Sequence, residues 1–67
     1  MKLTFIRKTV FSGETNCPSL YRTDRDTFVV QGWRVLDPET LAQLDIPAHE
    51  TVVEVPVDVL AEITARH

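Results

Sequence analysis

Nucleophilic catalysis by this chain would have to use Cys17, Ser12 or Ser19, activated by a neighbouring base. His49 is the only internal histidine, and it falls in a different predicted loop from Cys17. No two carboxylates have a recognisable catalytic spacing, and a chain with only two glycines has no glycine-rich phosphate loop. A chain this small would also have difficulty enclosing a ligand pocket of about 300 Å³. The sequence therefore predicts a protein that is not an enzyme, with a thiol sensor at Cys17 as the weakest alternative.

Metal ligands are equally scarce. A structural zinc site takes about four Cys or His ligands, and this chain offers Cys17, His49 and His67. Asp24 and Asp26 could supply two oxygen ligands, but their spacing does not match a calcium-binding loop. We expect no bound metal and no cofactor.

The residues best suited to binding a macromolecule gather in one predicted hairpin. They are arginine and aromatic side chains, the types most enriched in interface hot spots: Tyr21, Arg22, Arg25, Trp33 and Arg34. The same side chains could stack on bases and contact phosphates. However, Asp24 and Asp26 at the hairpin tip would repel phosphate, and the pI of about 5.1 is far from the basic value typical of nucleic-acid binders. Protein binding is therefore the leading interpretation and direct nucleic-acid binding the second, while packing of the aromatics in the chain's own core is the alternative to both.

The length of the chain also favours association. Its 67 residues allow one domain, assigned to residues 1–67, which would bury only about 60% of the surface that the unfolded chain exposes. Small domains usually gain stability from disulfides, metals or oligomerisation. Because a single cysteine cannot form an internal disulfide, a homo-oligomer, most simply a dimer, or docking on another protein is the expected source of further burial.

Charge is distributed unevenly along the chain. The net charge is −3, but residues 1–34 carry +3 and residues 35–67 carry −6. This asymmetry could mark an electrostatic footprint on one side, or it could reflect two structural layers with different solvated faces. An acidic second half could also speed the encounter with a basic partner.

No apolar run approaches the ~18–20 residues that span a bilayer. Charged residues interrupt the apolar residues at the N-terminus, and no small-residue cleavage site follows, so no signal peptide is predicted. Together with the single cysteine, these features favour a cytoplasmic location without membrane contact.

The first half of the chain is typical of β-structure. Residues 2–11 are rich in strand formers and are followed by a turn-rich loop over 12–19. Residues 19–24 and 27–36 are expected to form the arms of a hairpin around an Asp-rich turn. The second arm has apolar residues on both parities, which is typical of a central strand or of a strand that changes face at a bulge. We favour the central position, with Gly32 as the place for a bulge.

The clearest helix signal begins at Asp37. This residue is a good N-cap, and Pro38 suits the first helical position. Leu36 and Leu41 have the spacing of a hydrophobic staple. The sequence therefore predicts a helix over 38–44.

The remaining segments complete a small α+β fold. Leu41 and Leu44 are expected to face the core. A strand over 51–55 and a second helix over 57–66 follow. The resulting order, β-β-β-α-β-α, predicts a small mainly antiparallel sheet with a central β-hairpin and two short helices.

Several short motifs occur in the hairpin and after it. Residues 23–33 match T-D-R-x-T-[FY]-V-V-Q-G-[WY], followed by D-P-E at 37–39, L-D-I-P at 44–47 and V-E-V-P at 53–56. In this pattern the chain resembles a group of short actinobacterial proteins over about residues 18–60. Members of that group tend to be encoded beside helix-turn-helix transcription regulators, so the resemblance implies an accessory regulatory role, with such a regulator as a partner. It implies no catalytic residues.

Taken together, these features predict a small, cytoplasmic, non-catalytic accessory protein. We expect it to be dimeric and to act through protein contacts in transcriptional or stress regulation, with the hairpin as its binding surface.

Overall fold

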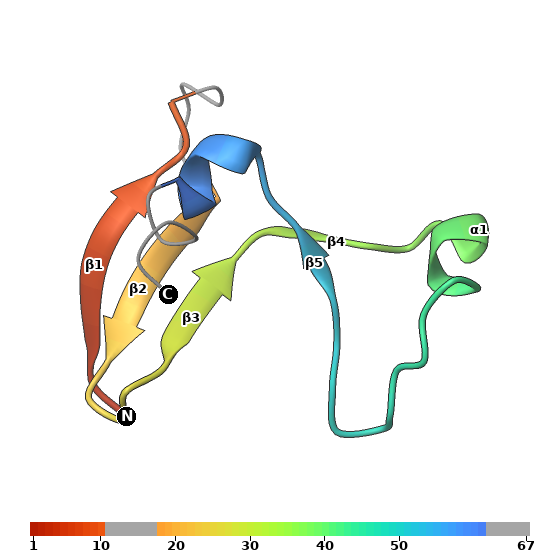
Figure 1. Cartoon of the computed structure of the whole chain (residues 1–67), viewed down its shortest axis with the longest axis horizontal. Helices are drawn as coiled ribbons and strands as arrows, with labels where there is room; N and C mark the ends of the chain where they lie inside the picture. The colour runs from red at the N-terminus through yellow and green to blue at the C-terminus, as the bar shows by residue number, and fades with distance from the viewer. Residues whose placement is uncertain (11–17, 62–67) are drawn as a thin grey trace.

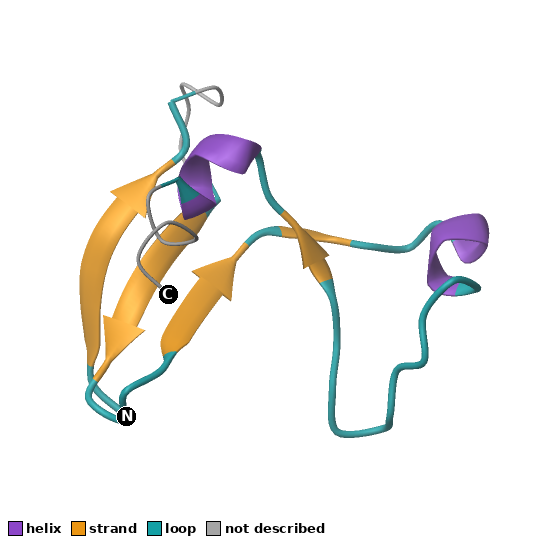
Figure 2. Ribbon diagram, in the orientation of Figure 1, coloured by secondary structure: helices purple, strands orange, loops and turns teal. Residues whose placement is uncertain are grey.

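The computed structural model describes residues 1–10 and 18–61 and consists mainly of short antiparallel strands (Figure 1; Figure 2). Along the chain these elements are β1 (Leu3–Lys8), β2 (Ser19–Thr23), β3 (Phe28–Gln31), β4 (Trp33–Arg34), α1 (Pro38–Leu41), β5 (Val53–Glu54) and the 3-10 turn η1 (Val57–Leu60). β1, β2 and β3 form one sheet, and β4 pairs with β5 in another. The predicted class, a small mainly antiparallel α+β fold built on a hairpin, is confirmed.

The β2–β3 hairpin is present, but its second arm is not the centre of the sheet. The strand order is β1-β2-β3, so β2 is flanked on both sides and β3 lies at an edge. The prediction that residues 27–36 form the central strand is therefore wrong. The first arm is central because β1 pairs with it antiparallel, with Leu3 opposite Thr23 and Phe5 opposite Tyr21.

Apolar residues occupy both parities of residues 27–36 because the segment belongs to two sheets. It is interrupted at Gly32, so that β3 pairs with β2 and β4 pairs with β5. A Cβ on Gly32 would lie 2.6 Å from Cγ1 of Val55 and 2.7 Å from the carbonyl oxygen of Glu54, closer than real Cβ atoms approach. Glycine therefore lets the chain pass close to β5 at the point where it changes sheet.

The turn η1 is fastened to the end of β1 through Asp58. One carboxylate oxygen accepts a hydrogen bond from the Thr9 hydroxyl at 2.8 Å, and the other accepts from the Val10 amide at 2.9 Å. η1 contacts β2, and both Val59 of η1 and Leu20 of β2 are fully buried. These two side chains are the buried apolar core of the described residues.

The second predicted helix, over 57–66, is wrong as a continuous helix. Its beginning is the 3-10 turn Val57–Leu60, which ends because Ala61 has an extended backbone with φ −59° and ψ 141°. Pro56 provides no side-chain hydrogen bond to cap the turn, and the two valines within it are β-branched residues, which favour helices less. Residues 62–67 lie outside the described part of the chain.

Helix α1 begins as predicted and ends earlier. Oδ2 of Asp37 accepts hydrogen bonds from the amide and the hydroxyl of Thr40 at 3.1 and 2.7 Å, which confirms the N-cap. The helix ends at Leu41 rather than at 44, because none of its residues is buried and a single unpacked turn is marginal. Leu44, expected in the core, is 48% exposed, and Leu36 is 72% exposed.

The chain as a whole is extended rather than compact. Residues 33–55, here called the arm, leave the three-stranded sheet after Gly32 and return before η1 (Figure 1). The other described residues, which include the three-stranded sheet and η1, are called the body. The predicted strand over 51–55 is present in the arm as β5. The Cα radius of gyration is 13.2 Å, against about 11 Å for a compact chain of this length.

Among residues 1–10 and 18–61, no helix has the length and apolar character needed to cross a membrane.

Candidate functional site

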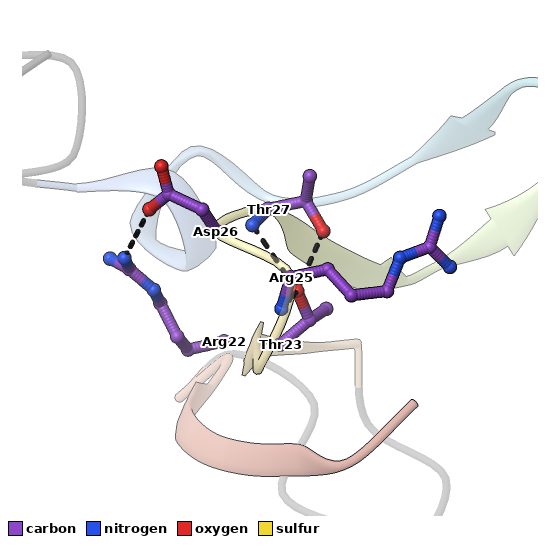
Figure 3. A network of polar contacts seen from close by, with 5 residues as sticks. All are labelled: Arg22, Thr23, Arg25, Asp26 and Thr27. Carbon is purple, nitrogen blue, oxygen red and sulfur yellow. Dashed lines mark hydrogen bonds and ion pairs between the residues drawn. The ribbon is translucent and has the colours of Figure 1, made fainter.

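The tip of the β2–β3 hairpin is held by a polar network centred on Thr23 (Figure 3). Its Oγ1 accepts hydrogen bonds from the amides of Arg25 and Thr27 at 3.0 and 3.2 Å, and lies 2.7 Å from the Thr27 hydroxyl. Asp26 has a positive φ of 62°, a conformation that Asp adopts more readily than most residues. This network fixes the turn that presents Arg25.

Arg22 is engaged within the hairpin itself. Its guanidinium pairs with Asp26 at 2.7 Å and lies 5.4 Å from the centroid of the Phe28 ring. The ion pair is exposed, so it adds little stability, but it neutralises the arginine. The side chain of Arg25 extends away from this pair (Figure 3). The tip therefore presents Arg25, which lies between Asp24 and Asp26 in the sequence.

Tyr21 belongs to the opposite face of β2 from Arg22, because side chains alternate along a strand. Its ring meets the ring of Phe5 in β1 edge-on, with centroids 5.8 Å apart and an interplanar angle of 69°. Its hydroxyl donates a hydrogen bond to Oε1 of Gln31 at 3.5 Å. Tyr21 is therefore part of an aromatic cluster on the sheet and not of the hairpin tip.

Trp33 and Arg34 lie in the arm, past the end of β3 that is remote from the hairpin tip (Figure 1). Trp33 is 48% exposed and stands opposite Glu54 of β5. The structure thus distributes the five predicted partner-binding residues over three places instead of joining them. Arg22 and Arg25 are at the tip, Tyr21 is on the sheet, and Trp33 and Arg34 are at the base of the arm.

One face of the three-stranded sheet carries two exposed apolar side chains, Leu3 and Phe5, which were not among the predicted binding residues. The cross-strand register places Leu3, Phe5, Tyr21 and Val29 on this face, which we call the open face. Leu3 is 46% exposed and Phe5 is 55% exposed. Lys8 belongs to the same side, since it stands opposite Ser19. The shared parity of Leu3 and Phe5 was visible in the sequence, but their exposure was not.

A second surface with exposed apolar side chains lies in the arm, mixed with polar and charged ones. It is a groove of about 730 Å³ between residues 34–37 and 52–55, flanked by Leu44, and we call it the arm groove. Leu36, Leu44 and Val53 are 72%, 48% and 41% exposed and all line it. Apolar side chains that share one hollow are typical of a binding surface.

Among the described residues, two carboxylates have lowered pKa values, and both serve structure. The Val10 amide is the main cause that lowers the pKa of Asp58, with the Thr9 hydroxyl adding to it against the opposing effect of desolvation. The hydroxyl and then the amide of Thr40 lower the pKa of Asp37. Each group holds one end of an element: Asp37 caps the start of α1, and Asp58 joins η1 to the end of β1.

The groups weighed for catalysis and metal binding are not assembled in the described part of the chain. No cluster of three or more His, Cys, Asp or Glu residues that could hold a metal occurs there. The His49 side chain is 81% exposed in the arm, whereas Ser19 is buried in β2. Ser12, Cys17 and His67 lie outside the described residues.

Comparisons with protein-family models, with curated proteins and with solved structures find no match. The likeness to the actinobacterial group therefore depends on the short motifs alone, and function has to be argued from the two apolar surfaces.

Proposed function

We propose that this chain is a non-catalytic protein-interaction module that completes its apolar burial by associating with protein, first of all with a second copy of itself. The imbalance between its core and its exposed apolar surface carries the proposal. Leu20 and Val59 are buried, whereas the large apolar side chains exposed in the described residues are Met1, Leu3, Phe5, Ile6, Val10, Trp33, Leu36, Leu44, Val53, Val57 and Leu60.

Full burial of a large apolar side chain stabilises a protein by about 1.5–3 kcal/mol relative to exposure, and the net stability of a domain is only about 5–15 kcal/mol. Isolated exposed apolar residues are ordinary on any protein surface. Here, however, two of them share the open face and three share the arm groove, and grouped apolar side chains of this kind mark interaction sites.

A helix-turn-helix regulator is the further partner class that we propose, and the motif resemblance supports it. We do not propose nucleic-acid binding by the hairpin, because the features of the tip do not favour it. Arg22 is paired with Asp26, and the two arginines of the tip are balanced by Asp24 and Asp26, so the tip carries no net positive charge to attract phosphate.

Concentration-dependent unfolding tests the proposal. If association supplies the missing burial, the Tm rises with protein concentration by mass action, and light scattering at micromolar concentration gives the mass of a dimer. Trp33, the only tryptophan, reports the transition by fluorescence. The proposal would be overturned by a monomer whose Tm is independent of concentration and which does not bind a helix-turn-helix regulator encoded beside its gene.

A further inference from the structure

We infer that two copies associate reciprocally, each laying its acidic arm across the open face of the other copy's basic body. This inference depends on the proposed function, because it requires self-association, and it adds which surfaces meet. Three observations support it: the amount of excess surface, the apolar side chains exposed in both contact areas, and the opposite net charge of the arm and the body.

The excess surface matches what a dimer would bury. The chain exposes 5563 Å², about 1,300 Å² more than the ~4,300 Å² expected for a compact monomer of its mass. A standard specific interface buries about 800 Å² on each partner, and homodimer interfaces often bury more. A second copy covering the arm and the open face would therefore bring the surface per chain close to that of a compact protein.

One contact area carries projecting apolar side chains, and the other is a hollow. Leu3 and Phe5 project from a strand at the edge of the three-stranded sheet, whereas the arm groove is a hollow of about 730 Å³. Both are exposed within one copy. In the reciprocal arrangement Leu3 and Phe5 of one copy enter the arm groove of the other, and the two identical contacts close a two-fold symmetric dimer.

The distribution of charge favours arm-on-body contact over arm-on-arm or body-on-body contact. The arm carries Arg34 against five carboxylates, a net charge of −4, whereas the described body carries five Lys and Arg side chains against three carboxylates. Lys8 lies on the open face, and no carboxylate belongs to that face among the described residues. An arm-on-arm dimer would set acid against acid and a body-on-body dimer base against base, and like-charge juxtaposition costs several kcal/mol.

Two charge-reversed proteins test the arrangement. The body-reversed protein carries Lys2→Glu and Lys8→Glu, and the arm-reversed protein carries Asp45→Lys and Glu54→Lys. All four positions are exposed, and none of these side chains forms a hydrogen bond or ion pair with another described residue. The matched controls keep the charge at the same positions: Lys2→Arg with Lys8→Arg, and Asp45→Glu with Glu54→Asp.

We expect each reversed protein alone to dissociate at least about tenfold more readily than the wild type, while the matched controls remain dimers. Mixing the two reversed proteins restores dimers of mixed composition, since one contact then keeps the wild-type charges and the other sets the introduced lysines of one arm against the introduced glutamates of the other body. Native mass spectrometry with one isotope-labelled partner identifies the mixed dimer, and circular dichroism checks that each variant is folded.

Other outcomes overturn the inference. An arm-reversed protein that pairs with the wild type more tightly than the wild type pairs with itself indicates arm-on-arm contact, and the same result with the body-reversed protein indicates body-on-body contact. In both cases, and if every variant stays dimeric, the proposed function stands and only this arrangement fails. A wild-type monomer removes self-association itself. If a reversed protein unfolds, the neutral pairs Lys2→Gln with Lys8→Gln and Asp45→Asn with Glu54→Gln replace it, and each must weaken the dimer.

Discussion

Gly32 shows how one residue can divide a strand between two sheets. Its backbone passes so near β5 that a side chain there would meet both the Val55 side chain and the Glu54 carbonyl oxygen. The side chain of Val55 can move, but the carbonyl belongs to a paired strand. The close approach therefore requires glycine at this position, and the arm depends on it.

Replacing Gly32 with alanine is expected to destabilise the protein by about 1–3 kcal/mol, the usual cost of overpacking. Urea unfolding at fixed protein concentration measures the change. In a Val55→Ala background, Gly32→Ala should destabilise the protein by less than it does in the wild type. It should still destabilise it, because the contact with the Glu54 carbonyl oxygen remains. A Gly32→Ala protein within about 0.5 kcal/mol of the wild type would contradict the close approach.

Thr23 is the second residue on which local structure depends. Its Oγ1 accepts hydrogen bonds from the amides of Arg25 and Thr27, and the residue is only 5% exposed. Thr23→Val keeps the shape but leaves both amides without this acceptor, so we expect a loss of about 1–3 kcal/mol. Thr23→Ser retains the hydroxyl and should cost much less. Equal losses in the two variants, compared by thermal unfolding, would show that the hydroxyl does not hold the turn.

At the scale of elements, β4, α1, β5 and η1 are very short, so contacts at their ends decide whether they form. Asp37 caps α1, and Asp58 joins η1 to the end of β1 across more than forty residues. Helices of a single turn have little stability of their own. These two carboxylates therefore stabilise α1 and η1, which helix propensity alone would not keep in place.

The contribution of Asp58 is expected to depend on pH. Its folded-state pKa is lowered below the ordinary value of 3.8, so its stabilising effect is complete above that value and is lost as pH falls through the folded-state pKa. Asp58→Asn should therefore be less stable than the wild type at neutral pH, and the difference should narrow in acid.

Unfolding curves of both proteins between pH 7 and strongly acidic pH check this expectation. Glu39→Gln is the control, because the Glu39 side chain is exposed and accepts no hydrogen bond from another described residue. A difference between wild type and Asp58→Asn that does not change with pH would show that the Thr9 and Val10 hydrogen bonds do not depend on the ionised carboxylate.

At the scale of the whole molecule, the arm and the body differ in both shape and charge. The extended arm is acidic and the body that remains is basic. A compact monomer would place its apolar side chains between such layers, whereas this chain leaves them exposed on two surfaces. The proposed association between copies would bring the apolar side chains and the opposite charges together at once.

Salt should therefore weaken the dimer. The screening length falls from about 10 Å at 0.1 M ionic strength to about 3 Å at 1 M, so the dissociation constant is expected to rise with sodium chloride concentration. Sedimentation at several salt concentrations measures it. A dissociation constant that falls as salt rises would indicate an interface dominated by apolar burial, without the arm-to-body attraction.

Features that depend on neighbouring residues could be predicted from the sequence. The cap at Asp37 and the hairpin turn before Thr27 each follow from what one residue and its nearest neighbours can do. The same is true of the uneven charge, which is a property of the order of residues. For this reason the fold class and most strand positions could be predicted. Gly32 was predicted as an irregular position, but as a bulge within one strand and not as a change of sheet.

The tertiary structure decided which surfaces are available for binding. Alternation along a strand indicates which side chains share a face, but not which face another element covers, so the exposure of Leu3 and Phe5 could not be predicted. Nor could the central place of β2, since it depends on β1, a segment distant in sequence. The predicted Arg and aromatic group was dispersed for the same reason: residues adjacent along a hairpin lie on opposite faces, and Gly32 carries Trp33 and Arg34 into a different sheet.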